Sequence, residues 1–349
     1  MHRIKKFILL LALFALPALT LAACLRNETS VDTGNAVEEK KLTIGMSFDS
    51  FVIERWQKDR DIFVQAAKEL GAEVNVQNAS GDVEEQRRQI DYLIKKGVDV
   101  LVIVCIDSDA LTDSVAAAKN EGIKVIAYDR LINNADIDLY ISFDNEMVGR
   151  LMAQSLIDHG LSGGKVIMIG GSPADNNVSL VENAFIKVMD DNKVEILDSM
   201  HCDGWRAELA SEYIYGHRAL VSQCDAIMCG NDNVASEVAV SLAVQRMAGK
   251  IMVTGQDADL EACQRIVEGT QIMTVYKPVE KLARRAAECA VALAGGEEIT
   301  GSDVGEIDNG GKTLPFVRLE PVMVTADNMD EVIIDSGFHS REEVYLNVK

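Results

Sequence analysis

The sequence predicts an α/β protein made of two similar doubly wound lobes, each built on a parallel sheet. Two observations lead to this fold class. From residue 41 onward, short apolar runs typical of strands alternate with longer amphipathic runs typical of helices. The alternation then occurs twice, over residues 41–144 and 145–277. Because strands and helices that alternate at regular spacing form repeated βαβ units, we expect parallel sheets.

The predicted strands are apolar along most of their length, which is typical of parallel strands buried on both faces of a sheet. In chain order they lie at residues 42–47, 72–77, 98–104, 123–128, 165–171, 193–199, 225–229, 250–255 and 272–276. The predicted helices lie at residues 54–70, 83–96, 109–121, 145–158, 178–191, 206–221, 233–247, 259–268 and 278–294. Residues 317–325 (VRLEPVMVT) form an extended run that we interpret as an interdomain connection.

The first residues of the chain carry the features of an export signal. Three basic residues precede the apolar run 7–21, which leads into the small residues and cysteine of LAAC (21–24). This ending resembles a bacterial lipobox, so we expect residues 1–24 to be a lipoprotein signal peptide with Cys24 lipidated. An ordinary secretory signal with an incidental cysteine is the alternative. Residues 25–40 predict a flexible tether, and the body would then be extracytoplasmic and lipid-anchored to the cell membrane.

Composition excludes several classes of function. The chain has 349 residues with 34 basic and 55 acidic side chains, and its net charge of −21 argues against a nucleic-acid partner. Five His and seven Cys without a CxxC pair leave little material for a metal site. There is no GxSxG, HExxH or phosphate-binding glycine loop, so we expect no enzyme activity, no metal and no cofactor. The cysteines after Cys24 are expected to be mostly free thiols.

Polar and aromatic side chains follow the predicted strands, at the edge where open parallel sheets bind ligands. They lie in segments 49–56, 128–130, 172–177, 203–205, 230–232, 255–257 and 276–278. Carboxylates, amides and cations suit sugar hydroxyls, and the chain's two tryptophans, Trp56 and Trp205, suit the apolar faces of a sugar ring. Taken singly, each residue could be an ordinary turn or cap residue, and Trp56 could belong to a core. Together they predict a carbohydrate site.

Several longer motifs carry a resemblance that covers nearly all of residues 41–340. They are GMSFDSFVIERWQKDRDIFV, GVDVLVIV, GIKVIAYDRLIN, ADIDLYISFDNE, GGSPADNN, GQDADL, GTQIMTVYKP and DSGFH. With them the chain resembles the bacterial periplasmic D-xylose-binding proteins of the ABC-transport substrate-binding family. The resemblance implies two Rossmann-like lobes of the type I periplasmic binding protein fold, joined by three hinge strands. It places the first lobe at 41–144 plus about 278–320 and the second at 145–277 plus about 321–349.

The resemblance also implies which residues contact the sugar. Trp56 and Trp205 would stack on the two faces of the ring. Hydrogen bonds would come from Arg55, Asp129 and Arg130 on the first lobe and from Asp175, Asn177, Asn231 and Asp257 on the second. Lys277 would complete the set at a hinge crossing, where ribose-binding relatives carry glutamine.

The expected function is capture of a monosaccharide, D-xylose or a related aldose, by closure of the two lobes. The expected partner is the membrane permease of an ABC importer, to which a monomeric protein would hand the sugar. A subunit that presents the sugar to a membrane histidine kinase or chemoreceptor is the alternative, since both roles use the same closure. A LacI-type repressor shares the fold but needs an N-terminal helix-turn-helix, and the export signal occupies that place.

Overall fold

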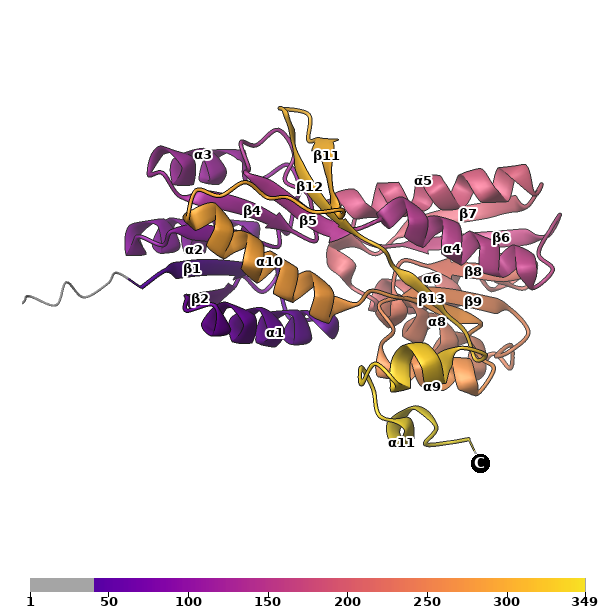
Figure 1. Cartoon of the computed structure of the whole chain (residues 1–349). Coiled ribbons are helices and arrows are strands. Elements are labelled where there is room, and N and C mark those ends of the chain that lie inside the picture. Colours follow the sequence, from indigo (N-terminus) through magenta and orange to yellow (C-terminus); the bar gives the residue numbers. More distant parts are fainter. Residues whose placement is uncertain (1–40, 349) are drawn as a thin grey trace, which may run out of the picture. The chain divides into compact units, whose positions relative to one another are not determined.

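The computed structural model describes residues 41–348, and these form two α/β lobes (Figure 1). The expected signal peptide 1–24, its Cys24 and the expected tether 25–40 lie outside the described residues. Among residues 41–348, no helix combines the length and apolar character needed to cross a membrane.

The first lobe is built on a seven-stranded sheet with the order β11-β12-β5-β4-β3-β1-β2. Its strands are β1 (Thr43–Phe48), β2 (Glu73–Asn78), β3 (Val100–Ile103), β4 (Lys124–Tyr128), β5 (Leu139–Phe143), β11 (Val304–Asp308) and β12 (Thr313–Leu319). All neighbours pair in parallel except β11 and β12, which form an antiparallel hairpin. The strand order is therefore that of a doubly wound sheet with a hairpin added at one edge.

Helices cover both faces of this sheet. One face carries α1 (Arg55–Glu69) and α10 (Val279–Ala294), whose apolar residues share a core with β1, β3 and β4. The other face carries α2 (Val83–Lys96) and α3 (Thr112–Asn120). Helix α2 begins where the Asp82 side chain accepts a hydrogen bond from Glu85 N, and it ends at Gly97 with φ 70°. These caps fix where the helix starts and stops.

The second lobe is built on a six-stranded sheet with the order β13-β10-β9-β8-β6-β7. Its strands are β6 (Lys165–Gly170), β7 (Glu195–His201), β8 (Ala226–Cys229), β9 (Met252–Gln256), β10 (Met273–Tyr276) and β13 (Val322–Val324), of which β13 alone among these described strands is antiparallel to its neighbour. Helices α4 (Asn145–Asp158) and α5 (Asn176–Asp191) cover one face. The other face carries α6 (Glu208–Gly216), α7 (Arg218–Val221) and α8 (Asp232–Val244).

A C-terminal segment completes the second lobe. It contains η2 (Asp330–Ile334) and α11 (Arg341–Val344), and it packs beside α9 (Leu260–Val267) (Figure 1). Met329, Ile333 and Val344 are buried in a separate apolar cluster with residues of α9. The segment therefore belongs to the folded body and is not a loose tail.

The chain passes between the lobes at three places. It leaves the first lobe after β5, returns to it between β10 and α10, and crosses again between β12 and β13. The last two strands run as one long band across both lobes in Figure 1. The ends of β5 and β12 pair side by side up to Phe143 and Leu319, so two of the crossings start next to each other.

The predicted fold class is confirmed, and each predicted strand is present with ends shifted by about two residues or less. Three corrections apply. Strand β5 was not predicted, because it follows β4 after an irregular loop without an intervening helix. The predicted helix 206–221 is two helices, which break at His217. The extended run 317–325 is confirmed as an interdomain connection, since it joins β12 of the first sheet to β13 of the second, but β11, which pairs with β12, was not predicted.

The cysteines within the described residues are all free and buried. They are Cys105, Cys202, Cys224, Cys229, Cys263 and Cys289. Burial raises the pKa of the Cys105 thiol to about 12, against the opposing effect of Arg130. A thiol with so high a pKa is a poor nucleophile at neutral pH, so these residues act as small apolar core groups.

Candidate functional site

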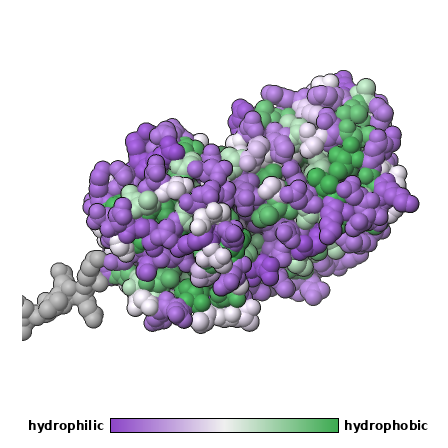
Figure 2. All heavy atoms as spheres, turned by 90° about the horizontal axis from the view of Figure 1, so that it is seen from above, coloured by the Kyte–Doolittle hydropathy of each residue, from purple (hydrophilic) through white to green (hydrophobic). Residues whose placement is uncertain are grey.

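A cavity lies at the carboxyl ends of the parallel strands, and both lobes contribute to its wall. The space between its lining residues, including the open solvent at its mouth, amounts to about 460 Å³. Nine of the predicted sugar-binding residues line it: Arg55, Trp56, Asp129, Arg130, Asp175, Asn177, Trp205, Asp257 and Lys277. In the space-filling view of Figure 2, the surface is indented between the two lobes.

Arg55 occupies the first turn of α1 and links several carboxylates. Its Nε and Nη2 donate to the two oxygens of Asp59, one turn along the helix, at 3.1 and 3.3 Å. Nη2 also lies 2.9 Å from Oδ2 of Asp129, at the end of β4. Arg55 is 2 % exposed. The Tyr128 hydroxyl donates to Asp59 and so fixes that carboxylate, which in turn fixes one edge of the Arg55 guanidinium. The other edge of the guanidinium reaches the cavity.

Arg130 makes a second buried charge network. Its Nη1 donates to Asp49 Oδ2 at 2.8 Å and to the carbonyl of Cys105 at 3.0 Å. Its Nε lies 2.8 Å from Oδ2 of Asp175, which belongs to the other lobe. Both Arg130 and Asp175 are almost fully buried. The pair therefore connects the two lobes directly at the cavity wall.

A third ionic contact involves the crossing between β10 and α10. Lys277 lies in this crossing, and its Nζ is 3.2 Å from Oδ1 of Asp257, which follows β9. The same carboxylate oxygen lies 3.8 Å from Nη1 of Arg55 on the first lobe. Asp257 is thus placed between a cation of the chain crossing and a cation of the first lobe.

The two tryptophans line the cavity from opposite lobes. Trp56 is 2 % exposed, packs against Phe48 and carries the Arg55 guanidinium at 4.5 Å from its ring centroid. Trp205 extends from the second lobe to pack against the apolar cluster that contains Trp56. The structure therefore makes Trp56 both a core residue and part of the cavity wall. No direct stacking between the two indoles is found among the described residues.

Gly171 makes the position of Trp205 possible. A Cβ atom at residue 171 would lie 2.2 Å from Cη2 of the indole, so any side chain there would displace the ring. Gly171 directly follows β6 and also lines the cavity.

Several site residues adopt backbone conformations that side chains ordinarily disfavour. The φ angles are 62° at Asp129, 57° at Trp205 and 96° at Asp257, with 56° at the next residue, Ala258. Non-glycine residues in this region cost energy and persist only where the surroundings hold them. Their concentration around one cavity is typical of a ligand site.

Asn177 and Asn231 are largely occupied by the protein itself. Asn177 Nδ2 donates to the Asp129 carbonyl at 3.0 Å, and its Oδ1 accepts from the Tyr140 hydroxyl at 3.2 Å. Asn177 therefore bridges the lobes. Asn231 is not among the residues of the cavity wall, and its side chain accepts from Val234 N as the cap of α8. Its role as a sugar contact stays a prediction.

Burial and the neighbouring charges shift the pKa values of the carboxyl groups at the site in different directions. Burial alone would raise the pKa of Asp129, but Arg55, Lys277 and Arg130 together bring that pKa below its ordinary value. At Asp49 and Asp175, burial outweighs the attraction of Arg130 and raises the pKa. Of these three groups, Asp129 is the one whose surroundings favour the charged form, which acts as a hydrogen-bond acceptor.

The predicted list of sugar contacts leaves out further residues of the wall, although Ile53, Gly230 and Gln256 lie in the strand-end segments singled out in the sequence. The omitted residues include Ile53, Gly170, Gly171, Val178, Val181, Glu182, Met228, Gly230 and Gln256. Gln256 stands next to the predicted Asp257 and donates from Nε2 to the Gly230 carbonyl at 2.5 Å. Its position at the end of β9 places it in the segment 255–257 that the sequence singled out, without distinguishing it as a contact. Val178, Val181 and Glu182 gave no such signal, because they look like ordinary residues of a helix.

The site offers hydrogen bonds but little net charge. Its three cations, Arg55, Arg130 and Lys277, face the carboxylates of Asp129, Asp175 and Asp257. Among the described residues, several buried polar atoms have no hydrogen-bond partner: Nε1 of Trp56 and Trp205, Nη2 of Arg130 and Oε1 of Gln256. Such atoms cost about 1–3 kcal/mol each unless a ligand satisfies them. The chemistry suits a neutral ligand rich in hydroxyl groups.

The fold and the cavity together define a two-lobed binding protein that encloses its ligand between the lobes. The family model described as "Periplasmic binding protein domain" matches residues 44–298. The chain is 44% identical to the D-xylose-binding periplasmic protein of Haemophilus influenzae, over 89% of this chain and 94% of that protein. The Escherichia coli protein of the same description is also 44% identical, over 89% of this chain and 95% of that protein.

Solved structures agree with these sequence relatives. An ABC transporter solute-binding protein from Clostridium phytofermentans, solved with β-D-glucose, has a TM-score of 0.78 and 30% identity, and covers 86% of this chain and 99% of its own. A solute-binding protein from Chloroflexus aurantiacus in complex with D-glucose has a TM-score of 0.79 at 28% identity, covering 87% and 98%. The chain belongs to the periplasmic binding protein family. The resemblance seen in the sequence is confirmed, and membership implies an extracytoplasmic location.

Proposed function

We propose that this protein captures D-xylose between its lobes and delivers it to the membrane permease of an ABC importer. The observation that carries the proposal is the cavity itself, which both lobes line with paired charges and indole rings. Two relatives at 44% identity are D-xylose-binding periplasmic proteins, and each aligns with this chain over almost its whole length. A solved relative is an ABC transporter solute-binding protein, which favours transport over the sensor alternative.

Closure supplies the affinity. A pentose has about ten heavy atoms, and micromolar binding needs about 8 kcal/mol, well below the ceiling of about 1.5 kcal/mol per atom. In an open cleft, each hydroxyl would exchange a bond to water for a bond to protein with little net gain. The ionic contacts Arg130–Asp175 and Arg55–Asp257 join the two lobes, so they form when the lobes close and hold the cavity shut around the sugar. A permease that binds the closed form alone would respond to the loaded protein.

In this closure the two lobes move relative to each other as rigid bodies. They are residues 41–144 with about 278–320, and residues 145–277 with about 321–349. The three crossings of the chain serve as the hinge. The protein binds without chemical conversion, in keeping with its relatives, which are binding proteins. It acts as a monomer in this proposal.

Isothermal titration of the purified body with D-xylose, D-ribose, L-arabinose and D-glucose tests the specificity. We expect the lowest Kd for D-xylose, because wrong hydroxyl positions leave buried groups unpaired at about 1–3 kcal/mol each. D-glucose adds a hydroxymethyl group that the closed cavity must accommodate. Tighter binding of any other sugar would overturn the D-xylose assignment.

We further propose that Cys24 anchors the protein to the membrane through lipid, a feature that lies outside the described residues. Two or three acyl chains anchor stably, whereas one alone binds only marginally. In cells fed labelled palmitate, the unchanged chain should incorporate label and Cys24→Ser should not. Label on the Cys24→Ser chain would show that the lipobox interpretation is wrong.

A further inference from the structure

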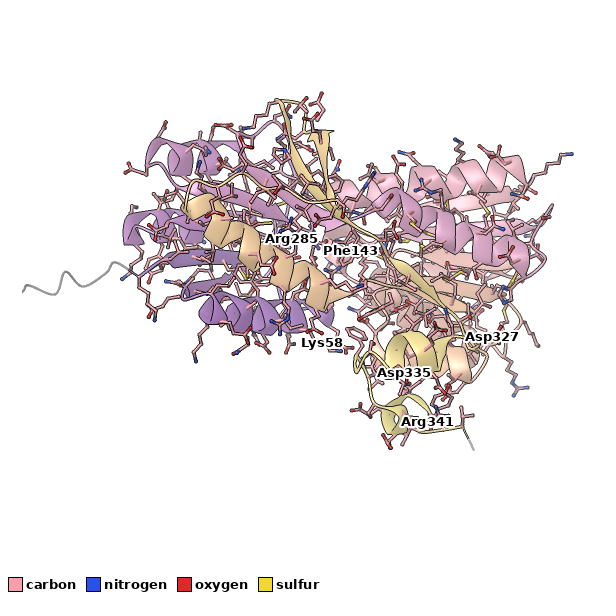
Figure 3. The ribbon with its side chains drawn as sticks, viewed as in Figure 1. Lys58, Phe143, Arg285, Asp327, Asp335 and Arg341 are labelled. Atoms are coloured by element: carbon pink, nitrogen blue, oxygen red, sulfur yellow. The ribbon has the colours of Figure 1, made fainter. Side chains whose placement is uncertain are left out.

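The motif DSGFH, residues 335–339, lies outside the cavity but contacts the elements that carry three of its charged residues. It sits in the C-terminal segment, between η2 and α11. In Figure 3, Lys58 on α1 lies at the boundary with the part of the chain that carries Asp335. None of the five residues of the motif lines the cavity.

His339 holds the turn that carries Asp257. Its Nε2 donates to the carbonyl of Ala258 at 2.8 Å, and the His339 side chain is buried. Both Asp257 and Ala258 have positive φ, so this turn needs support from its surroundings. Further bonds run from Asp257 N to the Val275 carbonyl at 2.8 Å and from Ala258 N to Thr274 Oγ1 at 3.2 Å. Those bonds come from the neighbouring strand, whereas the bond from His339 comes from the C-terminal segment.

Phe338 connects the same segment to the hinge and to the opposite lobe. Its ring packs on the ring of Tyr276, the residue directly before Lys277, with the ring centroids 4.8 Å apart. On its other side, Lys58 Nζ lies 3.8 Å from the Phe338 ring centroid and donates to the Phe338 carbonyl at 3.3 Å. Lys58 is three residues after Arg55 on α1, so this contact spans the lobes.

We infer that residues 335–339 form a positioning element for the sugar site: His339 fixes the Asp257 carboxylate, and Phe338 binds Lys58 when the lobes close. The inference rests on the proposed function and deepens it. One segment thereby couples the orientation of the sugar-binding carboxylate of Asp257 to closure of the lobes, although the segment itself does not touch the sugar. The cation–π contact of Lys58 with the Phe338 ring and the hydrogen bond from Lys58 to the Phe338 carbonyl both favour the closed state over the open one.

The His339 contact is tested with two substitutions. His339→Ala removes the donor and should raise the Kd for D-xylose about tenfold, the effect of about one hydrogen bond. His339→Gln places an amide Nε2–H where the imidazole Nε2–H stood, and should restore the Kd to within about twofold. A Kd raised equally in both variants would overturn the positioning role, because the packing of the imidazole ring, rather than its hydrogen-bond donor, would then determine the affinity for D-xylose.

A double-mutant cycle with Asp257→Asn separates positioning from general structural damage. If His339 acts through Asp257, His339→Ala should weaken binding far less in the Asp257→Asn background than in the natural chain. Additive effects on the binding free energy would contradict the inference. Near-equal thermal midpoints of the variants would show that all of them fold.

Hydrogen exchange of the sugar-free protein gives a readout that does not depend on which ligand binds. His339→Ala should speed exchange of the amides of residues 257–259, and His339→Gln should not. If the natural chain binds none of the tested sugars, the proposed function fails while this measurement still decides the positioning role. Unchanged exchange in His339→Ala would overturn it.

The Lys58 contact is tested by Lys58→Met, with Lys68→Met on the exposed part of the same helix as the matched control. Stopped-flow binding should show a several-fold faster dissociation of D-xylose for Lys58→Met and a nearly unchanged association rate, because the contact forms after the sugar has entered. The control should match the natural chain. An unchanged dissociation rate in Lys58→Met would refute the contact between the lobes as part of closure.

Discussion

Buried ion pairs decide the character of the site at the residue scale. Arg55 and Arg130 are each bound on one side by a carboxylate that holds them in place, Asp59 and Asp49 respectively. Removing one partner of such a buried pair leaves an uncompensated charge, which is more costly than losing an exposed pair. The residues behind the cavity wall therefore matter for binding even though they do not face the ligand.

Sequence reasoning found half of the wall residues and assigned no supporting role to Asp59 or Asp49. The Arg55–Trp56 pair, Asp129–Arg130 and Asp257 could be found because they follow predicted strands, where ligands bind in open sheets. Asp59 had a recognisable i,i+4 spacing from Arg55, but the same spacing is common on exposed helices. Gly171 gave no signal beyond its position, because only the structure shows the indole of Trp205 against it.

Trp205 is the residue whose contribution is easiest to measure. Trp205→Ala should weaken D-xylose binding by about 1.5–3 kcal/mol, because apolar and aromatic burial is lost from one face of the ring. Titration calorimetry gives the change, with Tyr215→Ala as a control that removes an exposed ring of α6. An affinity equal to that of the natural chain would show that the indole only fills space.

Turns and crossings, rather than the regular elements, shape the site at the element scale. Strand and helix positions followed from apolar periodicity, because buried parallel strands are almost uniformly apolar. Strand β5 and the hairpin β11–β12 escaped that reasoning, because their position depends on pairing between segments far apart in the chain. The left-handed turn at Asp257 and Ala258 likewise depends on contacts from β10 and from the C-terminal segment.

Acid should weaken the C-terminal segment through His339. Burial, with Lys58 nearby, lowers the pKa of His339 from 6.5 to about 4, although Ala258 and Glu343 oppose the shift. A histidine with a lowered pKa contributes its stability above pH 6.5 and loses it as the pH falls towards about 4. The unfolded chain takes up a proton in that window, and the folded chain does not.

Urea unfolding of the natural chain and of His339→Gln at a series of pH values measures this effect. Glutamine keeps the hydrogen bond to Ala258 but does not titrate in this range. The free energy of unfolding of the natural chain should therefore fall, relative to the variant, as the pH drops from 6.5 to about 4. A difference between the two proteins that stays constant with pH would contradict a depressed pKa at His339.

Two lobes and three crossings determine what the whole molecule can do. Polar contacts between the lobes surround the cavity: Arg130–Asp175, Arg55–Asp257 and Asn177 with Asp129. Trp205 against the apolar cluster of the first lobe and Lys58 on Phe338 add to them. Interfaces between domains of one chain are ordinarily more polar than obligate interfaces, which suits lobes that separate and close again. The repeated βαβ pattern predicted this architecture, whereas the relative placement of the lobes could not be read from it.

A crystal structure of the protein grown with D-xylose tests the central claim most directly. We expect one sugar ring in the cavity between Trp56 and Trp205, with its hydroxyls on Arg55, Asp129 and Lys277 and on the unpartnered Nη2 of Arg130. Lys58 should remain on Phe338 in that complex. A sugar bound elsewhere, or indoles turned away from a cavity without sugar, would contradict the account.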